Sequence, residues 1–245
     1  MKVSVAYIEE PPFYWTGSDH SATGADIELA EETLRAIGAT AIEYVPTTFE
    51  ELLPGVQAGR WDMNVPLFVT AERAQTVAFS VPVWALGDGF VVRHGNPKAL
   101  SCYEDVAAQG EAMLGLVAGT VQRDTAMNAG VPSDRIVTFS RQSDAVAALI
   151  AGEIDAYAAT AVGNREIVGT HRDLDAVAHE AAGHGGAPVG AFSFRRDNLA
   201  LLNAVNCQLR QYLGSADHRA RMAKYGLTKT EIEGAIQRAS GPSAV

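Results

Sequence analysis

Hydrophobic positions along the chain follow two spacings in turn, and each spacing predicts one kind of element. The β-branched runs at 3–8 (VSVAYI) and 42–46 (IEYVP) are typical of strands. Between them, 26–37 places apolar residues on one face of a helix, with Asp26 as its predicted N-cap and Gly38 as its predicted C-cap. This part of the chain is therefore expected to fold as strand, helix, strand.

A second predicted helix, over 48–59, leads into another extended run at 61–67 (WDMNVPL). Thr48 and Glu51 have the spacing of a capping box, and Pro54 is expected to kink the helix or to mark a late first turn. The alternation favours an α/β protein in which helices flank a mixed or parallel sheet.

The second half of the chain repeats this alternation. The segments 58–66 (AGRWDMNVP) and 151–159 (AGEIDAYAA) share a helix-ending Ala-Gly, two further residues, and an aspartate that leads into a strand. Glycine C-caps before strands are common in α/β proteins, but with the surrounding rhythm the match indicates two lobes of similar build. The elements predicted for the second half are a strand at 113–119, a helix at 120–130, a strand at 135–139, a helix at 143–152 and a strand at 154–160.

Two segments that combine strand-forming residues with glycines, 84–96 and 183–194, are expected to carry the chain between the lobes as hinge strands. The helical pattern from 198 to 239 is expected to pack back on the first lobe. The predicted division is therefore lobe 1 at 1–86 plus 192–245, and lobe 2 at 87–191.

The composition limits the class of partner. The chain has 245 residues, 47% of them hydrophobic and 20% charged, which is enough to bury a core without disulfides or metal. Its net charge of -10 argues against nucleic acid or an anionic membrane surface as partner. No apolar run approaches the roughly 20 residues needed to span a bilayer. The chain opens directly on a strand pattern, so either a signal peptide has been removed or the protein stays in the cytoplasm.

No cofactor or metal site is expected. Cys102 and Cys207 lack the clustered spacing of a zinc site or redox pair, and they form one disulfide or none. His171, His179 and His184 fit no usual ligand spacing and are expected at the surface. Zinc-protease, phosphate-loop and dinucleotide-binding motifs are all absent from the sequence.

One arginine stands out because apolar residues precede it directly. In DMNVPLFVTAERAQTVAFS, at 62–80, Arg73 closely follows Phe68. An arginine fork matches a carboxylate with paired planar donors, so an anionic ligand is one interpretation. An internal salt bridge or a solvated loop arginine is the other.

Six motifs in order give the chain its resemblance to a known family. They are GADIELAEETLRAIG, FEELLPGVQAGRWD, FVTAERAQTVAFSVPV, AGTVQRDTAMNAGVPSDRIVTF, AALIAGEIDAYAAT and GAFSFRRDN. Over nearly its whole length the chain resembles the extracellular solute-binding proteins of polar amino-acid ABC importers. The resemblance implies a type II periplasmic-binding-protein fold, in which two α/β lobes close on a small zwitterionic solute. It also implies a monomer, located in the periplasm or outside the cell, that delivers the solute to a membrane permease.

The same resemblance implies roles for particular residues. Arg73 holds the place of the arginine that grips the ligand's carboxylate. Gly119 and Thr120 match the turn of the second lobe that donates backbone N–H groups and a hydroxyl to that carboxylate. A helix N-cap is the alternative for this turn, and the two roles are compatible because helix N-termini favour anions.

The ligand's ammonium group lacks its usual partner in this sequence. Thr160 stands where amino-acid-binding members carry an aspartate, and Phe68 stands where they tend to have a small hydroxyl residue. The stretch between Asp62 and Arg73 is also one residue shorter than the family pattern. We therefore expect that the side chains that usually bind the ligand's α-ammonium group are missing.

The residues found instead of the usual ammonium-binding ones resemble those of the subgroup that binds ectoine and hydroxyectoine. Glu10 and Phe13 match that subgroup's first loop, where an acid and an aromatic ring meet the cationic ring of the ligand. Phe49 and Phe68 match further aromatic walls, and aromatic faces add roughly 0.5–2 kcal/mol each around a desolvated cation. The alternatives are core packing for the three phenylalanines and a solvated loop carboxylate for Glu10.

Two functions other than solute delivery are compatible with the sequence. A few members of the fold are cyclohexadienyl dehydratases, in which a carboxylic acid protonates a leaving hydroxyl, and Glu10 or Glu153 could take that role. A ligand-sensing input domain is the other alternative. We expect a binding protein rather than an enzyme.

Overall fold

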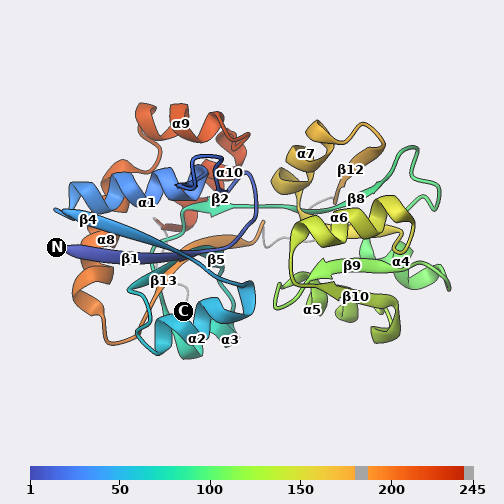
Figure 1. Ribbon diagram of the computed structural model, residues 1–245, viewed down its shortest axis with the longest axis horizontal. Coiled ribbons are helices and arrows are strands. Elements are labelled where there is room, and N and C mark those ends of the chain that lie inside the picture. The colour runs from blue at the N-terminus through green and yellow to red at the C-terminus, as the bar shows by residue number, and fades with distance from the viewer. Residues whose placement is uncertain (180–186, 240–245) are drawn as a thin grey trace. The chain divides into compact units, whose positions relative to one another are not determined.

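The chain divides into two compact units in the computed structural model, which describes residues 1–179 and 187–239 (Figure 1). Unit 1 comprises Met1–Leu86 and Gly186–Val245, and unit 2 comprises Gly87–Gly185. The first crossing lies inside the segment 84–96 that was expected to connect the lobes. Unit 1 resumes before the predicted boundary at 192, because the strand β13, Val189–Phe194, belongs to the sheet of unit 1.

The sheet of unit 1 has the order β4-β1-β5-β13-β6. The strands β4, β1 and β5 run parallel, whereas β13 is antiparallel to β5 and to β6, and also pairs with β7. Their bounds are β1 Lys2–Tyr7, β4 Ala41–Pro46, β5 Met63–Phe68, β6 Ala78–Phe79 and β7 Trp84–Ala85, and a short separate hairpin pairs β2 Trp15–Thr16 with β3 Ala22–Thr23.

Helices connect the parallel strands and cover both faces of this sheet. The helix α1, Ala25–Ala36, joins β1 to β4, and α2, Phe49–Gln57, joins β4 to β5, on opposite sides of the strands in Figure 1. The inner strand β5 is therefore buried along nearly its whole length, as its continuous apolar run predicts. The remaining helices of unit 1 are α3 Ala71–Thr76, α8 Leu199–Tyr212, α9 Ala216–Ala223 and α10 Lys229–Ala239.

The predicted start of α1 was wrong by two residues. Its N-cap is Gly24, at φ 125°, and a Cβ on this glycine would lie 2.3 Å from the carbonyl oxygen of Phe13. Only glycine lets the helix begin so close to the preceding loop. Asp26 consequently lies inside the first turn and is fully buried rather than capping the helix. The C-cap is Ile37, one residue before the predicted Gly38, and Gly38 follows it with φ 90°.

The capping box predicted for α2 does not form. Thr48 occupies the N-cap position, but its side chain makes no capping hydrogen bond. The Glu51 carboxylate pairs instead with Arg60, beyond the end of the helix. Pro54 lies inside the helix.

The sheet of unit 2 has the order β10-β9-β11-β8-β12. The strand β9 is parallel to β10 and β11, and β8 is antiparallel to β11 and β12. One face carries the apolar layer around Phe90 and Tyr103, and the other carries the layer around Val91 and Tyr157. The elements are β8 Asp88–Arg93, α4 Tyr103–Ala108, β9 Leu114–Val117, α5 Gln122–Asn128, η1 Ser133–Arg135, β10 Ile136–Phe139, α6 Gln142–Ala151, β11 Ala156–Thr160, α7 Ala161–Thr170 and β12 Leu174–Ala178.

The repeated Ala-Gly-x-x-Asp motif has the same structural role in both units. The Asp62 carboxylate, just before β5, accepts the N–H of Ser4 on the neighbouring strand β1 at 2.8 Å. The Asp155 carboxylate, just before β11, accepts the N–H of Met113, next to β9, at 2.9 Å. In each unit the aspartate thus fixes one strand against its parallel neighbour.

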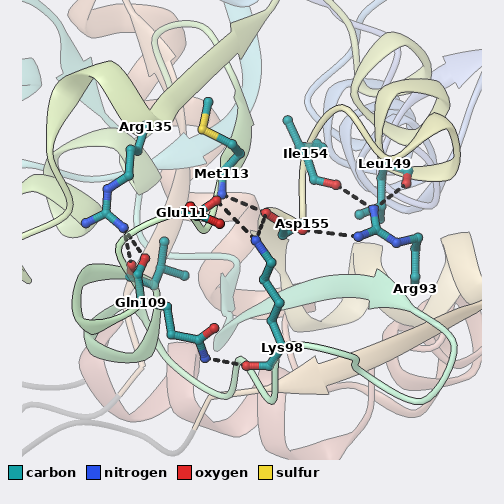
Figure 2. A network of polar contacts seen from close by, with 10 residues as sticks. Arg93, Lys98, Gln109, Glu111, Met113, Arg135, Leu149, Ile154 and Asp155 are labelled. Carbon is teal, nitrogen blue, oxygen red and sulfur yellow. Dashed lines mark hydrogen bonds and ion pairs between the residues drawn. The ribbon is translucent and has the colours of Figure 1, made fainter.

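Asp155 also anchors a polar network of unit 2 (Figure 2). Its carboxylate accepts Arg93 Nη2 at 3.1 Å and Lys98 Nζ at 2.9 Å, and Arg93 Nη1 donates to the Ile154 carbonyl at 2.8 Å. Burial alone would raise the pKa of the Asp155 carboxyl, but the Lys98 ammonium, the Met113 N–H and Arg93 outweigh it, so the pKa lies below its usual value.

Replacing Asp155 with alanine should lower the free energy of unfolding by roughly 2–3 kcal/mol, because two half-buried cations and a backbone N–H lose their acceptor. Urea denaturation at pH 7 measures this loss. Since the folded pKa lies below the unfolded one, the contribution is present above pH 3.8 and disappears as the pH falls through the folded value. The matched control is Asp144→Ala, which removes an exposed helical pair with Arg141 and should cost at most about 1 kcal/mol. Equal losses in the two variants would contradict the anchoring role.

Candidate functional site

The candidate residues of unit 1 follow three neighbouring parallel strands. Because β4, β1 and β5 are parallel, their carboxyl ends meet at one edge of the sheet. Ligands of open α/β sheets bind outside this edge. The predicted site residues lie there: Glu10 and Phe13 after β1, Phe49 at the start of the helix after β4, Phe68 at the end of β5, and Arg73 in the helix after β5.

Arg73 is buried, which excludes the solvated-arginine interpretation. The residue is 9% exposed and lies in the short helix α3. Thr70 caps this helix by accepting the Arg73 N–H at 3.2 Å. Nη1 donates to the Phe68 carbonyl at 2.8 Å, and the guanidinium carbon lies 5.3 Å from the centre of the Phe49 ring. The cation is thus held against an aromatic face, within reach of the strand end that carries Phe68.

Glu10 is a half-buried carboxyl rather than a freely solvated one. Its Oε2 accepts the Tyr14 hydroxyl at 3.1 Å, and its carbonyl accepts the Phe13 N–H at 3.0 Å, which closes a tight turn. Removal of water from around the carboxyl raises the pKa of Glu10 to about 7, although the Tyr14 hydrogen bond opposes the shift. The group therefore changes charge near neutral pH.

Trp84 connects the two aromatic residues that flank this edge. Phe13 is 2% exposed and lies 6.1 Å from the Trp84 ring, and Phe68 meets the same ring edge-to-face at 5.2 Å. The strand β13 passes close by, because a Cβ on Gly190 would lie 2.0 Å from the indole. Trp84 could not be identified from the sequence, since an apolar residue in the run VPVWAL gives no signal apart from core packing.

Asp26 is a second unforeseen carboxyl in unit 1. Its oxygens accept the Trp84 indole N–H at 3.2 and 3.3 Å, and the side chain is completely buried. Burial raises the pKa of Asp26 well above its usual value, and the charge of Glu10 raises it further. The protonated form of Asp26 is therefore favoured more than in an exposed aspartate, and its oxygens fix the indole.

The candidate residues of unit 2 also share one edge of their sheet. Gly119 and Thr120 follow β9, and Thr160 ends the parallel strand β11. Gly119 has φ 80°, and the Thr120 hydroxyl donates to the Val117 carbonyl at 2.8 Å. Thr160 is buried and caps α7 by accepting the Gly163 N–H at 3.1 Å. The N-cap of α5 is Val121, so the capping alternative for Thr120 does not apply.

One of the histidines differs from its predicted place. His179 is partly buried, its ring 4.3 Å from Phe90 and 5.0 Å from Tyr103, and burial lowers its pKa. His171 is half-exposed, and His184 lies outside the described residues. Within the described ranges, no cluster of histidine, cysteine and acidic residues could hold a metal ion, and none of the helices has the length and apolar character to cross a membrane. Cys102 and Cys207 are both free thiols in this structure.

The chain matches a known protein family over most of its length. The model for bacterial extracellular solute-binding proteins, family 3, matches residues 3–228. A probable amino-acid ABC transporter periplasmic-binding protein of Sinorhizobium fredii is 31% identical over 242 residues, covering 94% of this chain and 78% of that protein.

Two solved structures are also similar. The crystal structure of EhuB in complex with hydroxyectoine superposes with a TM-score of 0.83 at 27% identity, covering 96% of this chain and 94% of that one. An ancestral amino-acid-binding protein, described as a precursor of cyclohexadienyl dehydratase, gives a TM-score of 0.79 at 24% identity, covering 91% of this chain and 94% of that one. The second likeness extends to the fold alone.

Proposed function

Because the chain belongs to the bacterial extracellular solute-binding proteins of family 3, we propose that it captures a small zwitterionic carboxylate and presents it to the permease of an ABC importer. The family resemblance and the type II fold, with mixed sheets flanked by helices, are as the sequence predicted. The relative from Sinorhizobium fredii is a probable amino-acid ABC transporter periplasmic-binding protein. We propose the same compartment for this protein, acting as a monomer without cofactor or nucleic acid.

The observation that carries the proposal is the buried guanidinium at the carboxyl edge of the unit 1 sheet. Arg73 is packed on Phe49 and tied to the Phe68 carbonyl, so its orientation is fixed before any solute arrives. A prearranged, desolvated fork binds a carboxylate more strongly than a mobile surface arginine does. Arg73 is accordingly the proposed carboxylate clamp.

The cationic end of the solute is assigned to the acid and the rings of the same edge. Glu10 supplies the negative charge, and Phe13, Phe49 and Phe68 supply aromatic surface. Acid and rings together suit a delocalised cation better than a compact ammonium group. In unit 2, Gly119, Thr120 and Thr160 are the proposed solute contacts.

These assignments favour an ectoine-like compatible solute over an ordinary amino acid. Thr160 stands where a carboxylate would bind an α-ammonium group, and its hydroxyl is already engaged with the Gly163 N–H. The structure bound to hydroxyectoine is similar over 96% of this chain, which supports the same ligand class.

An enzyme of the cyclohexadienyl dehydratase type is the second candidate. One observation favours it: Glu10 has a pKa of about 7, which suits a general acid at neutral pH. Glu153 is a poor alternative acid, because it is exposed in the turn before β11, at the opposite edge of the sheet from Thr160. We propose binding without turnover.

Titration of the full chain with a solute panel tests both candidates. Calorimetry and thermal shift should detect ectoine or hydroxyectoine ahead of glycine betaine, arginine, histidine, glutamine and cystine, since a ligand of the folded state raises the melting temperature by mass action. Prephenate and arogenate are incubated with the protein in parallel and assayed for loss. Tighter binding of an ordinary amino acid would overturn the ectoine assignment, and loss of prephenate or arogenate would establish the enzyme.

A further inference from the structure

An unassigned carboxylate lies directly beside Thr160 in unit 2. In the antiparallel pairing of β8 with β11, Asp88 is the residue opposite Thr160. Directly opposed residues of an antiparallel pair project from the same face of a sheet, with their Cβ atoms about 4.5–5.5 Å apart. The acid that the sequence lacks at 160 is therefore present on the neighbouring strand.

Two side chains hold the Asp88 carboxylate in place. The Tyr103 hydroxyl donates to Oδ2 at 2.5 Å, and the Gln122 amide donates to Oδ1 at 3.2 Å. Gln122 opens α5, two residues after Thr120, and is 4% exposed. Asp88 thus lies at the edge where all the candidate residues of unit 2 gather. The Gly89 backbone N–H is a third donor to this carboxylate. A carboxylate offers about four acceptor positions, so these three donors leave room for one more.

The charge of Asp88 has no counterion within the described part of the chain, where no lysine, arginine or histidine forms an ion pair with it. His179 packs on Phe90 and on Tyr103, the residue that donates to Asp88, and burial lowers the pKa of His179. Burial raises the pKa of Asp88 to about 6, so the carboxyl is mainly ionised at pH 7.5. A half-buried carboxylate without a counterion gains most from a cation that arrives with a ligand.

We propose that Asp88 is a specificity-determining residue of unit 2, which binds the cationic nitrogen of the solute in the place that an aspartate at 160 would serve. This inference rests on the proposed function, since it assigns one more contact to the same solute. It names the class of cation as a delocalised one that carries N–H donors, such as the amidinium ring of an ectoine-like solute. A quaternary ammonium offers no N–H to the remaining acceptor position of the carboxylate.

The test compares two carboxylates that differ in their cationic group. Ectoine carries an amidinium ring, whereas pyroglutamate carries an uncharged lactam, and both are titrated into the full chain at pH 7.5. Asp88→Asn should weaken ectoine about tenfold and change pyroglutamate by less than twofold. Asp144→Asn is the matched control, because it removes an exposed carboxylate of the same unit that pairs only with Arg141 among the ion pairs described, and it should change both affinities by less than twofold.

A second variant separates charge from structure. Asp88→Asn combined with Thr160→Asp returns a carboxylate to the opposed position, and it should restore ectoine binding to within threefold of the parent chain. Equal losses for ectoine and pyroglutamate in Asp88→Asn, or no recovery in the double variant, would show that Asp88 only supports the fold.

Failure of this inference can be told from failure of the proposed function. Ectoine binding that Arg73→Ala removes and Asp88→Asn leaves intact overturns the inference alone. A parent chain that binds no carboxylate solute overturns both.

Discussion

Arg73→Ala should weaken every carboxylate solute by at least about 100-fold, which corresponds to the roughly 3–5 kcal/mol lost when one partner of a buried ion pair is removed. The reason is geometric as well as electrostatic, because the guanidinium is fixed by Phe49 and the Phe68 carbonyl. Calorimetry with ectoine, or with the solute that the panel identifies, measures the effect.

The control for Arg73 is the lysine variant, which keeps the charge and loses the planar fork. Arg73→Lys should fall between the parent chain and the alanine variant, about tenfold weaker than the parent. Melting temperatures without solute check that both variants fold. If Arg73→Ala binds the solute as tightly as the parent does, the carboxylate clamp is elsewhere.

Affinity for a cationic solute should rise as the pH rises through 7, and it should be about tenfold weaker at pH 6 than on the plateau above pH 8. The solute's cation selects the ionised form of Glu10, whose pKa is about 7, and the apparent dissociation constant grows as the ionised fraction falls. Calorimetry from pH 5.5 to 8.5 gives the profile.

Glu10→Gln is the control for this pH dependence. It should bind the solute roughly 30-fold more weakly than the parent at pH 8, with a much flatter profile, because the charge is gone and the shape is kept. A pH profile that is unchanged in Glu10→Gln would assign the titration to another group.

The raised pKa of Glu10 also changes how the stability of the solute-free protein depends on pH. The folded pKa of Glu10, about 7, lies above the unfolded value of 4.5, so folding stability falls as the pH rises from 4.5 through 7. A bound cation offsets the cost of the buried charge. The rise in melting temperature caused by the solute should therefore be larger at pH 8 than at pH 6.

Periodicity was sufficient to predict the order of the main strands and helices, because each buries an apolar stripe of regular spacing. It missed α4, which is only six residues long, and α7, in which Gly163, Gly169 and Thr170 weaken the helical signal. Both helices form because the sheet of unit 2 offers an apolar surface on each face.

The candidate site was predictable only where a residue follows a recognisable strand end. Asp26 has the local pattern of an N-cap, and its burial against Trp84 depends on a contact between segments 58 residues apart. Asp88 is adjacent to Thr160 only through strand pairing, which no local pattern encodes. Side chains whose roles depend on tertiary contacts, such as Asp26 and Asp88, therefore cannot be recognised from a local sequence pattern.

The position of β13 in the chain determines which unit can finish folding first. The strand lies between β5 and β6, and its Ser193 hydroxyl accepts the buried Asn64 amide at 2.8 Å, yet it is translated only after the whole of unit 2. Before β13 is present, one edge of β5 has no pairing partner, and Trp84 lacks the backbone of Gly190 against which it packs. Unit 2 is continuous in sequence and can complete its core first, whereas the sheet of unit 1 is complete only after β13 has been added.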